Sequence, residues 1–397
     1  MFIRYRKNNN GLSIPIARIY DKSEHHLDMH DIDYDAVWAI KKLKQTGAQA
    51  FIVGGAVRDL LLGSKPKDFD IATSASPRQV QRLFWNARVI GRRFKLVHLT
   101  FRDKIIEVST FRSGLEASEH GPSMYGTIEQ DAKRRDFTIN SLYLDPIENL
   151  IYDFNDSMED FKKCRIRSIL PLSNTFIEDP VRMIRAIKYA ETTSFALGWD
   201  LKRAIRSHAE ELEKVPTSRI TEEVTKILAS GESLSIIRAL QKYGLLVHLL
   251  PCLSMYARYP AFENSLRLLD EAVRDSKKAN RDLAKGQMFK ALAKPVIVLQ
   301  EQDELTAEER FRDVFRQIKV LISPITPANY DIEEAASMIL REAGFTVPKQ
   351  CLKAHKPLPS ISQRRKPQTE QGRNKPRRKV RSRAVQEVEK TEQSAMG

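Results

Sequence analysis

Cysteine is scarce in this chain, and long apolar runs are missing. The 397 residues include three cysteines, Cys164, Cys252 and Cys351, which lie far apart. Their spacing fits neither a metal motif nor a disulfide framework, which indicates a reducing compartment. No apolar run approaches the roughly 20 residues that a membrane span requires. The N-terminal stretch is basic, without an apolar core or a small-residue cleavage site, so it does not predict a secretory signal. An organellar transit peptide stays open, and a cytoplasmic protein is the simpler expectation.

Acidic residues are too few to balance the basic ones. The chain has 66 Lys plus Arg against 51 Asp plus Glu, a net charge of +15. This excess indicates a polyanionic partner, either nucleic acid or a membrane surface. Residues 351–397 alone carry +9 and contain no aromatic residue. Such a segment cannot bury enough apolar surface to offset its ordering entropy. We therefore expect residues 348–397 to be a disordered basic tail; a solubilising tail without a specific partner is the alternative.

Periodicity divides the rest of the chain into two parts, as its length leads us to expect. Residues 34–46 show helical spacing that stops at Gly47. The following stretches predict alternating strands and short helices, with a hairpin at residues 102–104. They are, in order, strand 48–55, helix 56–63, strand 68–73, helix 77–85, strand 93–101 and strand 105–112. Beyond residue 145 the patterns are helical, at 179–192, 200–215, 218–230, 233–250, 259–273 and 310–322. No fixed-period repeat indicates a solenoid.

Standard phosphate-binding fingerprints are also missing, but a Gly-Gly turn stands in a comparable place. In FIVGGAVRDLLLG, Gly54 and Gly55 follow a predicted strand and precede a predicted helix. Backbone N–H groups can approach a phosphate closely at such a turn, and the helix N-terminus adds favourable partial charge. Arg58, one turn later, is placed to reach the same phosphates. The stretch lacks the Gly-Lys-Ser of a Walker loop and the third glycine of a dinucleotide fingerprint. A tight turn without a ligand is the common alternative.

The segment KPKDFDIATSASP places two aspartates two residues apart. On a strand, Asp68 and Asp70 would share one face, with Cα atoms about 6.5 Å apart, while Phe69 and Ile71 would face the core. Two hard oxygen ligands aimed at one point suit Mg²⁺ and two-metal phosphoryl chemistry. For an isolated pair, a solvated acidic turn after Pro66 is the favoured alternative.

Three more polar groups follow. Glu107 and Ser109 share a strand face in IIEVSTFR, which Arg112 closes, and a half-buried strand explains that face equally well. In DAKRRDFTINSLYLD, Asp136 and Asn140 are four apart and are predicted to share a helix face, close to Arg134 and Arg135.

In FIEDPVRMIRAIKYA, Pro180 and the acids before it predict a helix start. Asp179, Arg182 and Arg185 then fall within an arc of about 120°. A capped helix with i,i+3 ion pairs is the favoured alternative for this segment.

Taken together and in order, five segments resemble a nucleotidyltransferase superfamily, the one that contains bacterial CCA-adding enzymes and bacterial type I poly(A) polymerases. They are FIVGGAVRDLLLG, KPKDFDIATSASP, IIEVSTFR, RRDFTINSLYLD and EDPVRMIRAIKYA. The resemblance covers roughly residues 34–250. It implies an α+β fold: a polymerase-β-like head with a mixed sheet and helices, all-helical neck and body domains, and a disordered basic tail. The implied organisation is an N-terminal extension 1–33, head 34–145, neck 146–240, body 241–347 and tail 348–397.

The resemblance also implies residue roles. Asp68 and Asp70 would hold two Mg²⁺ ions, with Mn²⁺ as a substitute, and Asp136 would be the third catalytic acid. Gly54, Gly55 and Arg58 would contact a triphosphate, and Arg112 would lie in a linker between head and neck. The residues expected on the nucleobase-recognition helix are Glu178, Asp179, Arg182 and Arg185, with Asp179 and Arg182 reading the base edge.

One stretch favours the poly(A) branch. VIGRRFKLVHL, Val89 to Leu99, resembles the poly(A) polymerase signature and adds the charges of Arg92, Arg93 and Lys95. His98 receives no chemical role. Residues 112–127 are shorter than in the enterobacterial enzymes, which leaves the function of that loop open.

The leading hypothesis is template-independent addition of AMP from ATP to RNA 3′ ends, with release of pyrophosphate. The expected partners are ATP, RNA 3′ ends and, through the basic tail, RNA-decay machinery; the chain is expected to be monomeric. A CCA-adding tRNA nucleotidyltransferase is the first alternative. A non-catalytic RNA-binding protein of the same fold is the second.

Overall fold

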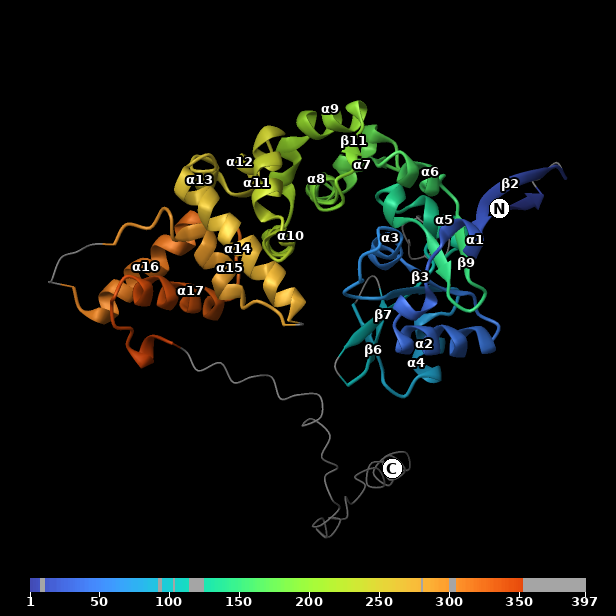
Figure 1. Ribbon diagram of the computed structural model, residues 1–397, viewed down its shortest axis with the longest axis horizontal. Coiled ribbons are helices and arrows are strands. Elements are labelled where there is room, and N and C mark those ends of the chain that lie inside the picture. The colour runs from blue at the N-terminus through green and yellow to red at the C-terminus, as the bar shows by residue number, and fades with distance from the viewer. Residues whose placement is uncertain are drawn as a thin grey trace, which may run out of the picture. The chain divides into compact units, whose positions relative to one another are not determined.

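The structure is a computed structural model, shown in Figure 1. It describes residues 1–7, 11–91, 95–102, 104–113, 125–279, 281–299 and 305–352. All described elements lie within the unit Met1–His355. Of the expected tail, only residues 348–352 are described, so the prediction of disorder falls outside the described residues. Arg92 and Arg93 fall outside them as well, whereas Lys95 is described and exposed.

The N-terminal part is organised around a nine-stranded sheet. The strands, in spatial order, are β1 Phe2–Lys7, β2 Ser13–Tyr20, β9 Leu150–Asp153, β8 Tyr143–Asp145, β3 Ala50–Val53, β4 Asp70–Thr73, β7 Ile105–Thr110, β6 Leu96–Thr100 and β5 Ala87–Ile90. Strands β4 and β7 pair in parallel, and the other described pairs of this sheet are antiparallel. The sheet takes strands from both sides of residues 34–145, and the domain boundaries stay a prediction.

The short helices of this part cover the two faces of the sheet (Figure 1). They are α1 Lys22–His25, α2 Tyr34–Gln45, α3 Gly55–Leu61, α4 Pro77–Leu83, α5 Ile128–Lys133 and α6 Ser157–Lys162, with 3₁₀ turns at Met29–Asp31 and Thr138–Asn140.

Side chains alternate between the two faces of the sheet along β3 and β4, so they pack in two different apolar clusters. Ile52 and Ile71 pack with α2 in one apolar cluster, and Phe69 packs against that cluster as expected. Phe51, Val53 and Ala72 pack with α5 in a second cluster, on the opposite face. Because side chains alternate along a strand, Asp70 shares its face with Ala72.

The remaining described part is helical and has one large core of its own. Its helices are α7 Leu172–Glu178, α8 Val181–Thr193, α9 Trp199–Ser207, α10 Thr217–Leu228, α11 Ser233–Lys242, α12 Leu246–Leu249, α13 Pro251–Ser254, α14 Pro260–Lys278, α15 Lys285–Ala293, α16 Ala307–Leu321 and α17 Asn329–Glu342. Two short strands, β10 Arg165–Ile166 and β11 Ala196–Leu197, pair in parallel, and 3₁₀ turns occupy Ala209–Lys214 and Lys349–Cys351. The predicted α+β class is confirmed. Within the described ranges, no helix has the length and apolar character of a membrane span.

Four local predictions were wrong. Asp68 lies before β4, so the two aspartates are not both on the strand. Residues 136–140 form a 3₁₀ turn at Thr138–Asn140 instead of an α-helix. The predicted helix 200–215 ends at Ser207 and continues as a 3₁₀ turn. The predicted helix 233–250 breaks at Gly244, whose φ of +79° is left-handed.

Candidate active site

The Gly-Gly turn connects β3 to α3 and lies against two charged side chains. Gly54 has a φ of +73°, which favours glycine. A Cβ built there would lie 3.8 Å from Asp70 Oδ2 and 3.9 Å from an Arg135 Nη1 atom. Those are ordinary contact distances, so backbone conformation rather than space requires glycine at this position. The turn therefore brings backbone N–H groups next to one acid and one cation.

Three carboxylates gather at the start of β4. Asp70 pairs in parallel register with Glu107 of β7, and both side chains lie on the face shared with Ala72. Asp70 is exposed at the surface, yet surrounding protein atoms desolvate its carboxylate. This desolvation, followed by the charges of Glu107 and Asp68, raises the pKa of Asp70 to about 6, and Arg135 partly opposes the rise. Asp68 contributes from the loop that precedes the strand.

These carboxylates fit a divalent cation by donor type. An oxygen-only set with unbalanced negative charge is the environment that Mg²⁺ prefers, because the ion keeps several waters and needs few protein ligands. No three His, Cys, Asp or Glu side chains among the described residues form a ready-made cation cage. The arrangement is therefore an open one, with two or three carboxylates on one side.

Glu107 has a neighbour that the sequence left without a role. His98 of β6 lies directly across from Glu107 in the β6–β7 pairing. Its Nε2 atom is 3.2 Å from Glu107 Oε1. The imidazole is thus placed to orient the Glu107 carboxylate from the side opposite to Asp70.

Arg135 is the cation beside Gly54, and a buried network fixes it. Its Nε donates to the Tyr143 hydroxyl at 3.0 Å, and its Nη2 donates to Asp131 at 3.2 Å. The Tyr143 hydroxyl donates to the same Asp131 carboxylate at 2.6 Å. Burial alone would lower the pKa of Arg135. The interactions with Tyr143 and Asp131 have a larger effect, and they raise the pKa of Arg135. Arg134 also donates to Asp131, at 2.5 Å.

Arg58 is also held in place. Its Nε and Nη2 donate to Asp59 at 2.9 and 2.7 Å, and its Nη1 donates to Asn140 Oδ1 at 2.9 Å. The guanidinium carbon lies 5.1 Å from the centre of the Tyr189 ring on α8. Arg58 therefore joins α3, the 3₁₀ turn and α8, with its cation beside the Gly-Gly turn.

Asp136 stands where the sheet part meets α8. Its Oδ1 accepts from the backbone N–H of Phe137 at 2.8 Å, and its Oδ2 lies 3.9 Å from Arg185 Nη1. The acids that act on Asp70 are Glu107 and Asp68, and Asp136 is not among them. Asp136 is thus tied to α8 rather than to the Asp70 cluster.

The predicted recognition residues occupy the junction of α7 and α8. Glu178 ends α7, Asp179 follows it, and Arg182 and Arg185 lie on α8. Arg182 Nη1 donates to the Thr175 carbonyl at 3.0 Å and lies 3.4 Å from Glu178.

Other partners replace the i,i+3 ion pairs of the alternative prediction. Arg182 pairs with Glu178 at i,i+4, and α10 supplies the partners of Asp179 and Arg185. Arg219 of α10 donates to both Asp179 carboxylate oxygens, at 2.9 and 3.1 Å. Arg185 Nε donates to Glu223 at 3.2 Å, and Lys188 donates to the same carboxylate at 3.0 Å. One face of α10 therefore holds two of the four recognition residues.

Arg112 lies beside the sheet, at a bridge with Tyr125. Its backbone N–H donates to Asp131 Oδ1 at 3.1 Å. Burial, and then the charge of Arg134, lower the pKa of Arg112. Most of the loop at 112–127 falls outside the described residues, so its function stays a prediction.

The sequence argument missed Asp131, Tyr143, Tyr189, Arg219 and Glu223. A usable signal existed for Asp131, because Asp131 and Arg135 have i,i+4 spacing and form an ion pair. Arg219 and Glu223 have the same spacing but bind partners on α7–α8 instead of each other. The pairing of Tyr143 with Asp131 had no such signal, because it depends on how β8 meets α5.

Comparisons with known proteins confirm the resemblance. Residues 50–167 match the family model described as the poly A polymerase head domain. Residues 194–256 match the model described as a probable RNA and SrmB-binding site of polymerase A.

Among relatives, poly(A) polymerase I of Haemophilus influenzae is 40% identical over 259 residues, covering 60% of this chain and 57% of that protein. The CCA-adding enzyme of Geobacillus thermodenitrificans is 34% identical over 218 residues, covering 54% of each chain. This chain thus spans less than two thirds of the length of either relative. A solved complex of a CCA-adding enzyme with ATP shares the fold, with a TM-score of 0.55 and 21% identity over 82% of this chain and 85% of that one.

Proposed function

Starting from the confirmed resemblance to bacterial poly(A) polymerases, we propose that this chain adds AMP from ATP to RNA 3′ ends without a template. The reaction joins the RNA 3′-oxygen to the α-phosphorus of ATP and breaks the bond to pyrophosphate. One observation carries the proposal: Asp70 and Glu107 lie in register on adjacent strands, with the Gly54 turn and the fixed Arg135 cation beside them. A carboxylate cluster for metals and a cation with backbone donors for phosphates are the two parts that this chemistry needs.

The acids position the reacting groups. Asp68 and Asp70 would hold the divalent cations, and Glu107 would complete the set from the neighbouring strand. When bound, two Mg²⁺ ions, or Mn²⁺ as a substitute, would activate the 3′-hydroxyl and neutralise the leaving pyrophosphate. Asp136, predicted as the third catalytic acid, is the competing candidate for the place that we give to Glu107.

The cations and the turn would bind the triphosphate. Arg135 and Arg58 are held by networks on their far sides, so their remaining donors are pre-oriented and lose little freedom on binding. Backbone N–H groups of Gly54 and Gly55 would approach the phosphate oxygens. Arg112 would act from the neighbouring linker. These groups stabilise charge rather than transfer protons.

Asp179 and Arg182 would read the base. A carboxylate accepts from the adenine amino group, and a guanidinium donates to a ring nitrogen. Arg219 and Glu223 would keep Asp179 and Arg185 oriented from α10, and Glu178 would do the same for Arg182. Protein side chains would thereby replace a template.

The basic excess supports RNA as the second substrate, with affinity that falls as salt rises. We assign the tail a role in binding RNA or RNA-decay machinery, and a cytoplasmic location. Deletion of residues 353–397 would test this role through the salt dependence of RNA affinity.

The deciding assay is extension of an unstructured RNA and of a tRNA lacking CCA, with each NTP alone and with all four. Sustained growth with ATP alone on the unstructured RNA is the expected result. Growth that stops after C, C and A on the tRNA would move the chain to the CCA-adding alternative, which the Geobacillus relative supports. Absence of pyrophosphate release with every substrate would leave the non-catalytic RNA-binding alternative.

Variants locate the third acid in the same assay. Asp70→Asn should abolish extension, and Asp275→Asn, at an exposed aspartate of α14, is the matched control. If Glu107 completes the metal set, Glu107→Gln should raise the Mg²⁺ concentration needed for half-maximal rate, whereas Asp136→Asn should not. The reverse outcome would restore Asp136 to that role.

A further inference from the structure

Helix α9 carries an exposed aromatic and cationic stripe. Trp199, Lys202, Arg203 and Arg206 follow i, i+3, i+4, i+7 spacing, which places them within an arc of about 100°. Leu201 and Ile205 lie on the opposite face and are buried.

Trp199 is 74% exposed, and the Arg203 guanidinium lies 5.7 Å from the centre of its ring. Among the described residues, no ion pair involves the three cations. An aromatic platform among free cations is the composition of surfaces that bind single-stranded nucleic acid.

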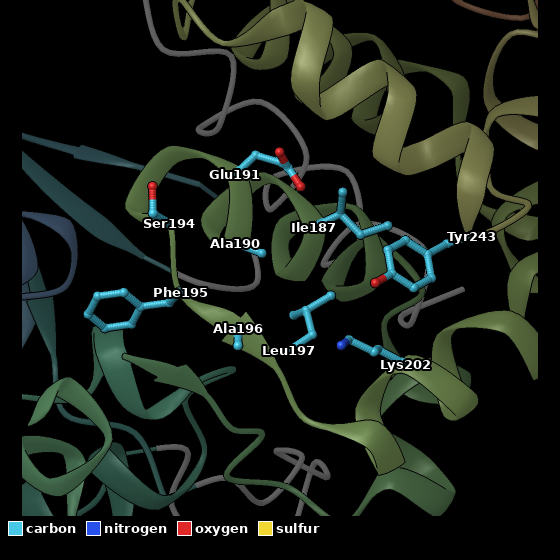
Figure 2. Close-up of a pocket in the computed structure, with 9 residues that line it drawn as sticks. All are labelled: Ile187, Ala190, Glu191, Ser194, Phe195, Ala196, Leu197, Lys202 and Tyr243. Atoms are coloured by element: carbon cyan, nitrogen blue, oxygen red, sulfur yellow. The ribbon is translucent and has the colours of Figure 1, made fainter. Parts of the chain in front are cut away.

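A pocket opens beside this stripe. Its volume is about 330 Å³. Its lining comes from α8, β11, the two residues between them, α9, and Tyr243 directly after α11. The apolar part is formed by Ile187 and Leu197, and the polar ends are Glu191, Lys202 and Tyr243. Figure 2 shows the Tyr243 hydroxyl and the Lys202 amine turned toward Leu197, with Glu191 on the other side of Ile187. The volume lies at the lower end of the range for small-molecule pockets, so it suits one nucleoside rather than a longer segment.

The pocket and the stripe are joined through shared residues. Lys202 belongs to both. The Arg206 guanidinium lies 5.0 Å from the centre of the Tyr243 ring, and Lys242 Nζ lies 6.0 Å from it. A strand whose phosphates follow α9 would therefore pass the mouth of the pocket.

We propose that this pocket is a nucleoside subsite, which takes one unstacked base with an exocyclic amino group from an RNA strand bound along α9. The inference rests on the proposed function, because it assigns the subsite to the RNA substrate or product. RNA binding along α9 agrees with the family match over residues 194–256. The new element is a base-selective contact in the pocket, away from the acid cluster.

Glu191 provides the selectivity. Its carboxylate only accepts hydrogen bonds, so it matches the amino group of adenine and opposes the carbonyl oxygens of uracil. Burial raises the pKa of Glu191, which indicates a carboxylate shielded from solvent and in need of a donor; a hydrogen bond from Ser235 meets part of that need. Tyr243 is largely buried and lines one side of the pocket. Cytosine and guanine also carry an amino group. Adenine is the one that the proposed function supplies, so an oligoadenylate strand is the expected occupant.

The test uses the full chain without ATP and measures fluorescence anisotropy of labelled oligoadenylate and oligouridylate of about 15 nucleotides. Glu191→Gln should reduce the ratio of adenylate to uridylate affinity by about tenfold, since an amide also donates to uracil. Lys202→Ala and Arg203→Ala should weaken both oligonucleotides equally. Each should also flatten the slope of log affinity against log salt by about 0.7. Matched controls come from the exposed Arg267–Glu271 ion pair of α14, as Glu271→Gln and Arg267→Ala.

An unchanged ratio in Glu191→Gln, with a urea midpoint equal to that of Glu271→Gln, would overturn the base subsite. Unchanged affinity for both oligonucleotides in the two α9 variants would overturn the RNA surface and leave this face to a protein partner. The extension assay on the same preparations distinguishes failure of the proposed subsite from failure of the proposed AMP-adding activity. A chain that extends RNA but fails these tests refutes the subsite alone, and one that passes them without extending RNA refutes the proposed activity alone.

Discussion

Replacing Asp70 by asparagine should stabilise the metal-free protein while abolishing the proposed AMP addition. The ionised carboxylate lies near Glu107 and Asp68 and is partly desolvated, so its ionisation destabilises the folded state. Asparagine has nearly the same shape and no charge, which removes the repulsion but also a proposed metal ligand. The substitution is therefore expected to raise the stability of the protein and to remove its proposed function.

The magnitude follows from the pKa. A rise from 3.8 to about 6 corresponds to about 3 kcal/mol before any correction. Because the Asp70 side chain is exposed, solvent screening reduces this figure, and we expect a gain of about 1 kcal/mol in the free energy of unfolding. The raised pKa fixes the sign with pH. The gain is largest above pH 6, shrinks as the pH falls toward the unfolded-state value of 3.8 and vanishes below it.

Urea unfolding of wild type, Asp70→Asn and the control Asp275→Asn at pH 8 and pH 4.5 measures this gain. Added Mg²⁺ should then stabilise wild type more than Asp70→Asn, since a ligand of the folded state shifts unfolding by mass action. A variant that is no more stable than wild type at pH 8, or whose advantage persists unchanged at pH 4.5, would refute the reasoning.

Three further predictions concern fixed groups around the site. Arg135→Met should lower the free energy of unfolding by about 3 kcal/mol in urea titrations, because it removes a partner from buried Asp131. A loss smaller than that of Arg267→Ala, which breaks an exposed ion pair, would contradict a stabilising role of the Arg135–Asp131–Tyr143 network. Gly54→Ala and Gly47→Ala should each lower the free energy of unfolding by about 1–2 kcal/mol, since both glycines have positive φ. Only Gly54→Ala should also impair AMP addition. Equal activity of the two variants would count against a phosphate-binding turn. Arg219→Ala should change the free energy of unfolding by less than about 1 kcal/mol, because its ion pair with Asp179 is exposed. The variant should still lower the ratio of kcat/KM for ATP over CTP, because it releases Asp179. An unchanged ratio would mean that α10 does not orient the proposed base-reading carboxylate of Asp179.

Local periodicity predicted those elements whose pattern and boundary residues agree. The helix at Tyr34–Gln45 and the β6–β7 hairpin belong to this group, because each has an unbroken period and a turn at its end. The strand at Ala50–Val53 was predictable instead as a short apolar run that ends at a Gly-Gly turn. The place of Asp70 was predictable for the same reason, since alternation fixed its face once Ile71 was assigned to the core.

Contacts between distant segments were beyond such reasoning. The segment after Arg135 was predicted as a helix, but the backbone N–H of Phe137 is satisfied by Asp136, and the Asn140 side chain by Arg58. The edge hairpin β1–β2 was missed because exposed and apolar residues do not alternate cleanly in FIRYRK. The partners of Asp179 and Arg185 lie on α10, so only the packing of α8 against α10 brings them together.

The parallel pairing of β4 and β7 ties the order of folding to the appearance of the acid cluster. Parallel neighbours cannot be joined by a tight turn, so the chain must first pass through α4, β5 and β6 before Glu107 comes level with Asp70. Such a long-range pairing forms slowly compared with local hairpins. A nascent or partly folded chain therefore exposes scattered single carboxylates rather than a cluster. The proposed cation site therefore forms only when the centre of the sheet is complete.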